Sequence, residues 1–337
     1  MTVSLLSIAA CSTNETERRD PGQNTAPPDA GDPGEGGDTT PNGGGTGAPP
    51  GDVTEVFYVD PASKPANWVK KNPNDPRAQK IQSQLASKTI AHWFGDWNKN
   101  ISKDTSEYVA AATAAKKWPL LVIYNMVNRD CGGASAGGAA NAGAYRTWIS
   151  SLARAIGNQR AMVVLEPDAL PHLEDCDREM RLDLLRYATE QFHHEAPNAR
   201  VYIDSGTAKW IKPDVMAERL DAAGVRKVRG FAINVSNFFT TEESVAYGNE
   251  VNESLAAKFG YRGQFVIDTS RNGNGSNGEW CNPPHRKIGP SSQWGGGAEA
   301  LMWIKVIGDS DGPCGVAPNL PSGTFSADLA IDLIDGK

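Results

Sequence analysis

The sequence predicts an α/β fold in which parallel strands alternate with helices to form a β/α barrel. Short apolar runs recur between residues 56 and 307, and amphipathic segments separate them. No glycine fingerprint of a dinucleotide-binding fold follows the first strand. With about seven or eight strand-helix units, a barrel is favoured over an open doubly wound sheet.

The predicted strands are rich in Val, Ile and aromatic residues, which favour a pleated backbone. They cover residues 56–60, 92–97, 120–126, 161–168, 200–206, 230–236, 264–270 and 301–307. The predicted helices place apolar residues three and four positions apart among strong helix formers. They lie within residues 75–88, 105–118, 142–157, 177–196 and 240–260.

Residues 1–11, MTVSLLSIAAC, differ from the rest because they are apolar and end at a cysteine. The letters IAAC fit the bacterial lipobox, in which Cys11 becomes the lipidated first residue of the mature protein. A signal peptide also has a basic start and a longer apolar region, so we expect the true start to lie upstream of Met1. The alternative is a short disordered N-terminus with an incidental cysteine.

Residues 12–52 contain 10 Gly and 7 Pro, and Ala is their only apolar residue type. Such a composition cannot bury enough surface to offset its ordering entropy, which predicts a disordered linker. The linker carries 8 acidic and 2 basic residues, so residues 53–337 are nearly neutral. A neutral domain gives no electrostatic reason to expect nucleic acid as a partner.

Four cysteines follow Cys11, and none forms a CxxC pair or has the histidine spacing of a zinc site. In an exported chain, four such cysteines predict two disulfides, for which the sequence allows three pairings. With the barrel in mind, we favour the nearest-neighbour pairing, Cys131 with Cys176 and Cys281 with Cys314. Free buried thiols of a cytosolic protein are the alternative.

Acidic or amide side chains stand at or just past the end of each apolar run. They are Asp60, Asp96, Asp130, Asp168, Asp204, Asn237, Asp268 and Asp311. In a β/α barrel the carboxyl ends of the strands converge on the face where active sites are built. A helix cap is the alternative for any one of them, and we favour a cap or structural hydrogen bond for Asp60, Asp96 and Asp268.

Several tryptophans stand in polar, glycine-rich surroundings, and of these we place Trp210 and Trp280 in the cleft. Carboxylates with aromatic walls point to glycoside hydrolysis, which needs one protonated carboxyl and a base or nucleophile opposite it. The five histidines supply no catalytic dyad, and no GxSxG serine hydrolase motif occurs.

Five segments resemble, in order, the motifs of glycoside hydrolase family 6, the inverting cellulases. They are VIYNMVNRDCGG, VVLEPDALPHL, IDSGTAKW, IDTSRNGNGSNGEWCNPPHRKIG and LMWIKVIGDSDGPC. The resemblance covers residues 53–337 as one catalytic domain. It implies a distorted (β/α) barrel with about seven parallel strands and an active-site cleft at their carboxyl ends. It also implies hydrolysis of β-1,4-glucan with inversion, without a cofactor or metal.

The resemblance assigns catalytic roles to five side chains. Asp168 of the EPD motif would be the general acid, and Asp130 of the RDC motif would raise its pKa and help organise the water. Asp311 matches the candidate base, Asp204 matches a fourth aspartate, and Tyr124 matches the tyrosine beneath the distorted sugar.

Further positions follow from the same resemblance. We expect Arg129 to fix Asp130 or Asp311 by a charge-assisted hydrogen bond. The positions that match sugar-contacting residues are Trp93, Trp210, Asn237, Trp280, Lys305 and Asp309.

The sequence departs from the family pattern at three places. Val306 and Ile307 replace small residues, and Asp309 replaces a glutamate, which puts subsite affinity and turnover in doubt. Val127-Asn128 stands where Pro-Gly is common, and Thr207 stands where a histidine is frequent.

The domain of residues 53–337 is small for a barrel that must also roof a tunnel, so we expect an open cleft and an endoglucanase. The alternatives are a cellobiohydrolase of the same family, a weakly active surface glycan-binding lipoprotein, and a barrel enzyme for another polysaccharide. We expect a monomer that binds β-glucan or cello-oligosaccharide. It would be extracellular or held at the cell surface by a lipid on Cys11.

Overall fold

A computed structural model describes residues 56–337 of the chain, and the predictions for Cys11 and the linker 12–52 lie outside these residues. The described residues contain an eight-stranded sheet in the order β1-β2-β3-β4-β5-β6-β8-β7. Seven of these strands run parallel, and the edge strand β7 pairs antiparallel with β8. The strands are β1 His92–Gly95, β2 Leu120–Tyr124, β3 Ala161–Leu165, β4 Ala199–Asp204, β5 Gly230–Ile233, β6 Gln264–Asp268, β7 Gln293–Trp294 and β8 Ala300–Met302.

Hydrogen bonds across the gap between β1 and β8 bring the two sides of the sheet together. The amide of Ala91 donates to the carbonyl of Trp303 at 2.9 Å, and the indole N–H of Trp93 donates to the carbonyl of Ile304 at 2.8 Å. The sheet is therefore curled into a distorted barrel, and the predicted fold class is confirmed.

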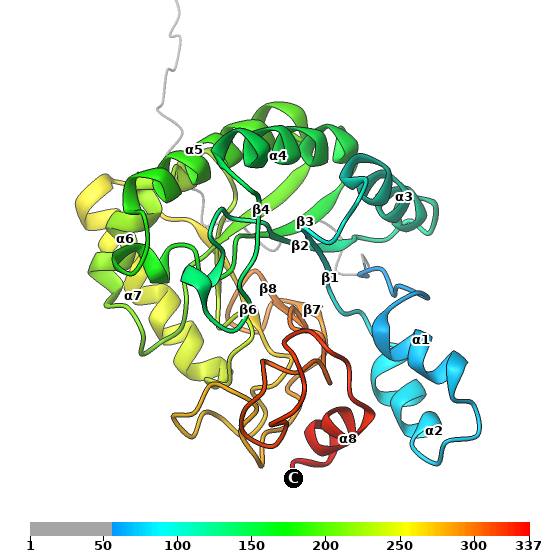
Figure 1. Cartoon of the computed structure of the whole chain (residues 1–337). Coiled ribbons are helices and arrows are strands. Elements are labelled where there is room, and N and C mark those ends of the chain that lie inside the picture. The colour runs from blue at the N-terminus through cyan, green and yellow to red at the C-terminus, as the bar shows by residue number, and fades with distance from the viewer. Residues whose placement is uncertain (1–55) are drawn as a thin grey trace, which may run out of the picture. The chain divides into compact units, whose positions relative to one another are not determined.

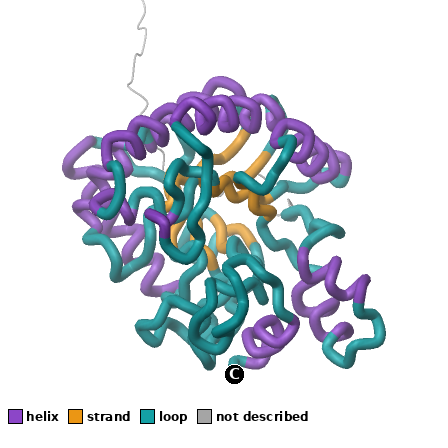
Figure 2. Tube along the Cα trace, in the orientation of Figure 1, coloured by secondary structure: helices purple, strands orange, loops and turns teal. Residues whose placement is uncertain are grey.

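Helices α3 to α7 lie outside the strands, whereas the segment after β6 is mostly loop (Figures 1 and 2). Every predicted helix is present. The helices are α1 Lys64–Lys71, α2 Ala78–Ile81, α3 Ile101–Ala114, α4 Ala142–Ile156, α5 Arg178–Glu195, α6 Pro213–Ala222, α7 Thr241–Phe259 and α8 Ala327–Asp335. The short helices α1, α6 and α8 were not predicted, because eight to ten residues give a weak periodic signal.

One predicted strand is wrong. Residues 56–60 form no named strand, and only Phe57 makes a single parallel bridge, to Trp118. Its aromatic ring lies in the barrel interior, so the apolar pattern reflects burial rather than a ladder of hydrogen bonds.

Alternation along the strands separates two apolar regions. In β2, Leu121 and Ile123 belong to the cluster that includes the outer helices. Leu120 and Val122 belong to the cluster inside the barrel. Because side chains alternate with a period of two, the interior face continues toward the polar residues at the strand ends.

A third apolar cluster fills the space between β1, β8 and the short helices. Ile81 of α2, Ile334 of α8 and Trp303 after β8 all belong to it and are buried. This cluster covers the side of the barrel where β1 and β8 are not paired as strands. Among residues 56–337, no helix has the length and apolar character to cross a membrane.

Candidate active site

The interior face of the barrel ends in polar side chains at the carboxyl ends of the strands. Tyr124 lies two residues after the interior Val122, and Asp204 lies two residues after the interior Tyr202. By alternation, both point into the barrel. Asp268 occupies the corresponding place at the end of β6.

Asp168 lies three residues past β3, in a turn where its own φ is +69°. The hydroxyl of Tyr124 donates to its Oδ2 at 3.4 Å, and its backbone N–H donates to Oδ2 of Asp204 at 2.9 Å. Burial, with the like charge of Asp130, raises the pKa of Asp168 to about 6. This carboxyl is therefore able to hold a proton in mildly acidic solution.

Glu166, the first carboxylate of the LEPDAL segment, has a structural role. It is fully buried, and its Oε2 accepts the backbone N–H groups of Asn125 at 3.0 Å and Met126 at 2.8 Å. Burial raises its pKa to about 7. Glu166 thus ties the exit of β3 to the exit of β2, which explains why two carboxylates flank one proline there.

Asp204 supports the turn that carries Asp168. Its Oδ2 accepts from the backbone of Asp168 and, at 3.3 Å, from the N–H of Gly206. Its Oδ1 is buried without a hydrogen-bond partner among the described residues. Burial and the nearby charge of Asp168 raise the pKa of Asp204 well above its usual range.

Asp130 begins a tight loop at residues 130–138. It has a φ of +56°, and its Oδ2 accepts the backbone N–H of Ser135 at 2.7 Å. Nε2 of His172 lies 3.8 Å from its Oδ1. The hydroxyl of Ser135 contacts that of Ser322 at 2.8 Å, so this loop meets the one that follows Asp311.

The predicted partner of Arg129 is wrong. Its Nη1 donates to Oδ1 of Asp96 at 2.8 Å and to the carbonyl of Tyr124 at 2.9 Å, and not to Asp130 or Asp311. The guanidinium lies 4.7 Å from the centre of the Tyr124 ring. Arg129 therefore supports Tyr124. Its carboxylate partner, Asp96, directly follows β1.

Asp311 is held ionised by two cations. Arg271 Nη1 lies 2.7 Å from its Oδ2, and Lys305 Nζ lies 2.9 Å from its Oδ1. The backbone N–H of Asn282 also donates to Oδ2, at 3.1 Å. Burial acts to raise the pKa of Asp311, but Arg271 and Lys305 outweigh it and lower the pKa to about 2.

Lys305 connects the two groups of carboxylates. Besides its contact with Asp311, its charge acts to lower the pKa of Asp168. Arg271 was missed by the sequence analysis, although its place in IDTSRNG, three residues past the end of β6, could have marked it.

Asp309 and Asn237, both expected to contact sugar, have protein partners. The carboxylate of Asp309 pairs with Lys64 from α1, and the same ammonium group donates to the carbonyl of Gly323 at 2.7 Å. Asn237 accepts the N–H of Phe238 through its Oδ1 at 3.1 Å. A sugar contact by Asp309 would have to compete with Lys64.

The three expected sugar-binding tryptophans differ in exposure. Trp93 is half-buried and packs edge-on against Tyr124, with ring centres 5.3 Å apart. Trp210 is 40% exposed and contacts the ring of His172. Trp280 is 57% exposed. Exposed indole faces suit stacking on the apolar face of a sugar ring.

Both disulfides form as predicted, Cys131 with Cys176 and Cys281 with Cys314. Cys131 adjoins Asp130, and Cys314 lies three residues after Asp311. Each disulfide therefore anchors a loop that carries a candidate catalytic aspartate.

The predicted structural hydrogen bonds of two further aspartates, Asp60 and Asp268, are confirmed. Asp60 accepts the N–H of Ala62 at 2.7 Å. Asp268 accepts four backbone N–H groups, those of Ser236, Ser270, Ile304 and Lys305. Among residues 56–337, no group of three or more His, Cys, Asp or Glu side chains could hold a metal ion.

Known proteins share this sequence and this arrangement of strands. The profile of the family described as "Glycosyl hydrolases family 6" matches residues 53–328. Endoglucanase 1 of Streptomyces halstedii is 47% identical over 294 residues, which cover 86% of this chain and 91% of that protein.

The chain belongs to glycoside hydrolase family 6.

Other family 6 proteins extend the comparison. The endoglucanase Cel6 of Mycobacterium tuberculosis, solved with methyl-cellobiosyl-4-deoxy-4-thio-β-D-cellobioside, is 35% identical, with a TM-score of 0.76. That match covers 84% of this chain and 97% of the solved one. Exoglucanase-6A of Humicola insolens is 27% identical over 71% of this chain and 60% of its own length. The family 6 fold and the predicted family are thus confirmed, and this chain is a glycoside hydrolase.

Proposed function

We propose that this family 6 protein is an endo-acting hydrolase of β-1,4-glucosidic bonds in cellulose or related β-glucans. We also propose that it inverts the anomeric configuration and that Asp168 is its general acid. The observation that carries the mechanism is the contrast between two carboxyls at one end of the barrel. The pKa of Asp168 is raised to about 6, whereas the pKa of Asp311 is lowered to about 2. Opposite shifts of this kind are what acid and base roles require.

In the proposed reaction, Asp168 donates its proton to the glycosidic oxygen as the bond to the anomeric carbon breaks. Tyr124, whose hydroxyl contacts Asp168, lies beneath the sugar at that bond. Asp204 holds the backbone of Asp168, so it acts as a positioning residue.

Asp311 is the proposed base, and it accepts a proton from the water that attacks the anomeric carbon on the opposite face. Its ion pairs with Arg271 and Lys305 keep it charged from about pH 2 upward, so between about pH 2 and 6 Asp311 is charged while Asp168 is protonated. Asp130 contributes a negative charge that helps to keep Asp168 protonated, and it helps to organise the water.

The endo-acting assignment is supported by the named relatives. Among the relatives matched by sequence, the endoglucanases of Streptomyces, Thermobispora bispora and Cellulomonas fimi are 39–47% identical to this chain, whereas the proteins called cellobiohydrolase or exoglucanase are 27–29% identical. Trp93, Trp210 and Trp280 are the proposed stacking surfaces for successive glucose units.

The proposal is tested by following the anomeric proton signals of a soluble cello-oligosaccharide during hydrolysis by the full chain. We expect α-anomer as the first product. First release of β-anomer would contradict inversion, and absence of product would favour a glycan-binding lipoprotein. Viscosity loss of a soluble cellulose measured against reducing ends released separates endo from exo action, since a cellobiohydrolase lowers viscosity slowly.

We propose in addition that the protein acts outside the cell, anchored through lipidated Cys11 and the linker 12–52, as a monomer. The two disulfides support an oxidising compartment. Mass spectrometry of the mature N-terminus tests the anchor. A diacylglyceryl group on Cys11 is expected, and an unmodified thiol in membrane-free protein would contradict it.

A further inference from the structure

Trp97 is an exposed tryptophan that has no part in the proposed reaction. Strand β1 ends at Gly95, and Trp97 stands two residues further along the chain. Trp97 is 51% exposed, between the values of Trp210 and Trp280. It belongs to none of the three apolar clusters formed by residues 56–337. Packing in the core therefore does not explain why a tryptophan stands at this position.

The Trp97 ring folds back over the interior side of β1. In this strand, Phe94 belongs to the outer cluster, whereas Trp93 packs against the cluster inside the barrel. Because side chains alternate along a strand, Gly95 faces the interior. A Cβ on Gly95 would lie 2.5 Å from Cη2 and Cζ3 of Trp97 and 2.8 Å from the carbonyl oxygen of Tyr124. The indole thus fills the space that a side chain at position 95 would need, at the mouth of the barrel.

Arg129 links the Trp97 ring to the ring of Tyr124. Its guanidinium carbon lies 5.3 Å from the centre of the Trp97 ring and 4.7 Å from the centre of the Tyr124 ring. This guanidinium is fixed, because it donates to Asp96 and to the carbonyl oxygens of Tyr124 and Ser135 at 2.8–2.9 Å. Trp97 therefore lies beside Tyr124, the residue proposed to lie beneath the sugar at the bond that is cleaved.

The contacts of Trp97 hold its ring in place and leave about half of the residue accessible. Gly95 lies against the edge of the ring, and the Arg129 guanidinium lies over it. An aromatic ring that is already fixed loses little conformational freedom when a ligand packs on it. The apolar face of a glucose unit has the shape and chemistry to pack on such a surface.

We propose that Trp97 forms an additional stacking site for a glucose unit of the substrate, next to the unit above Tyr124. The inference rests on the proposed function, because its ligand is a β-1,4-glucan chain. It adds a fourth aromatic surface to those of Trp93, Trp210 and Trp280. Since Arg129 contacts both rings, a glucan chain that packs on Trp97 also has a fixed position relative to Tyr124.

The test is calorimetric titration of the full chain with cellohexaose in the Asp168→Asn background, which slows cleavage during the measurement. Adding Trp97→Ala should weaken cellohexaose binding about tenfold, because the stacking surface is lost. Trp97→Tyr keeps a flat ring and should bind within about threefold of the Asp168→Asn protein. Trp97→Leu fills the space over Gly95 without a flat ring, so it should bind as weakly as Trp97→Ala.

A matched control removes a tryptophan from the outer layer. Trp148→Leu in the same background alters a half-buried residue of α4, and its cellohexaose affinity should equal that of the Asp168→Asn protein. Equal weakening in Trp148→Leu and Trp97→Leu would overturn the proposal. So would equal affinities of Trp97→Leu and Trp97→Tyr, because residue 97 would then act only by filling space beside Arg129. Unchanged affinity in Trp97→Ala would overturn it directly.

The proposed function is decided separately, by the anomeric products of the unaltered chain. Hydrolysis of cellohexaose combined with unchanged binding in Trp97→Ala would overturn the stacking site and leave the catalytic proposal intact. Absence of product combined with binding that depends on Trp97 would do the reverse. Absence of cellohexaose binding by the Asp168→Asn protein would overturn the stacking site whatever the products are.

Discussion

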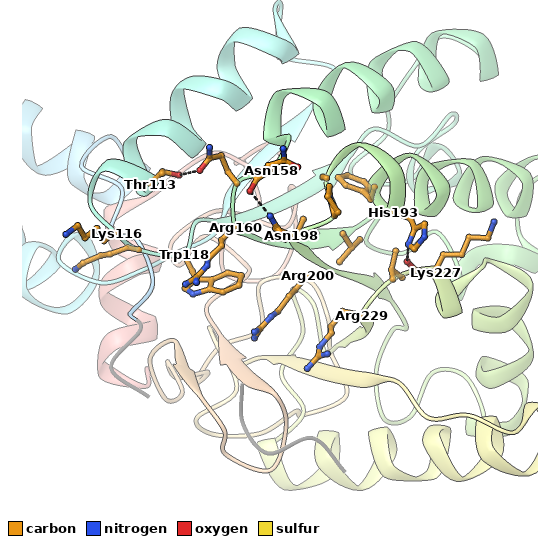
Figure 3. A pocket seen from close by; sticks show the side chains of 18 residues that line it. Thr113, Lys116, Trp118, Asn158, Arg160, His193, Asn198, Arg200, Lys227 and Arg229 are labelled. Atoms are coloured by element: carbon orange, nitrogen blue, oxygen red, sulfur yellow. Dashed lines mark hydrogen bonds between the residues drawn. The ribbon is translucent and has the colours of Figure 1, made fainter. Parts of the chain in front are cut away.

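The two ends of the barrel are built from the same strands but carry opposite charge. At the carboxyl ends, Asp204 and Asp311 are buried and Asp168 is half-buried, and the pKa values of Asp168 and Asp204 are raised. At the amino ends, Arg200 and Arg229 pair with buried Glu299, and Lys116, Lys117 and Lys227 lie at the same end (Figure 3). At the carboxyl ends, carboxyl groups with shifted pKa values are available for proton transfer. At the amino ends, the carboxylate of Glu299 fixes the positions of two arginines.

The largest expected effect is the loss of kcat when the proposed acid at the carboxyl end of the barrel is removed. For Asp168→Asn we expect kcat on an unactivated cello-oligosaccharide to fall about 10²- to 10⁴-fold, because no proton reaches the leaving oxygen. The loss should be smaller with a p-nitrophenyl leaving group, which needs little protonation. Steady-state rates on both substrates check this, and equal losses on the two would argue against an acid role.

Removing the central carboxylate of the amino end should cost stability and leave catalysis intact. Glu299→Gln leaves Arg200, Arg229 and the Tyr202 hydroxyl without their charged partner, so we expect about 3–5 kcal/mol loss in the free energy of unfolding. Denaturant titration measures it. The pH profile of the folded variant should match that of the unaltered enzyme, and a shifted profile would mean that the two ends are electrically coupled.

The pH profile itself should reflect the carboxyl end. In the unaltered enzyme, kcat/KM should decline as the pH rises through about 6, where Asp168 loses its proton. In Lys305→Met, Asp168 and Asp311 both lose a stabilising cation, so both pKa values rise. Both limbs of the profile should therefore move to higher pH, by about one unit, and a stationary profile would contradict this.

The smallest shift is expected for Asp130→Asn. Its charge raises the pKa of Asp168, but burial is the larger cause. The alkaline limb should move to lower pH by less than about one unit, in the direction opposite to that of Lys305→Met. The initial rate of cello-oligosaccharide hydrolysis across pH provides the measurement, and an upward move would remove Asp130 from this role.

Much of the fold was predictable because its signals are local. Strand runs such as LLVIY and the long helix at residues 241–259 carry their periodicity in consecutive residues. The aspartates could be assigned to strand ends for the same reason. Residues 56–60 misled the prediction because an apolar run records burial, and burial inside a barrel does not require a paired strand.

The partners of the site residues could not be predicted, because they come from distant segments. Arg129 reaches Asp96 rather than Asp130, and Asp309 is met by Lys64, 245 residues away. Asp311 depends on Arg271, 40 residues earlier. Such ion pairs depend on where the loops run in the folded protein. The periodicity of the sequence carries no information about these positions.

The positions of the two disulfides bear on how the enzyme matures. Cys131–Cys176 and Cys281–Cys314 fasten the loops of Asp130 and Asp311, whereas none of these four cysteines lies within the helices α3 to α7 that cover the sheet. We therefore expect a chain with reduced cysteines to form the sheet and its covering helices through apolar contacts, while the loops of Asp130 and Asp311 are less ordered. Thiol oxidation would then be the final step of maturation, and full activity would require an oxidising compartment.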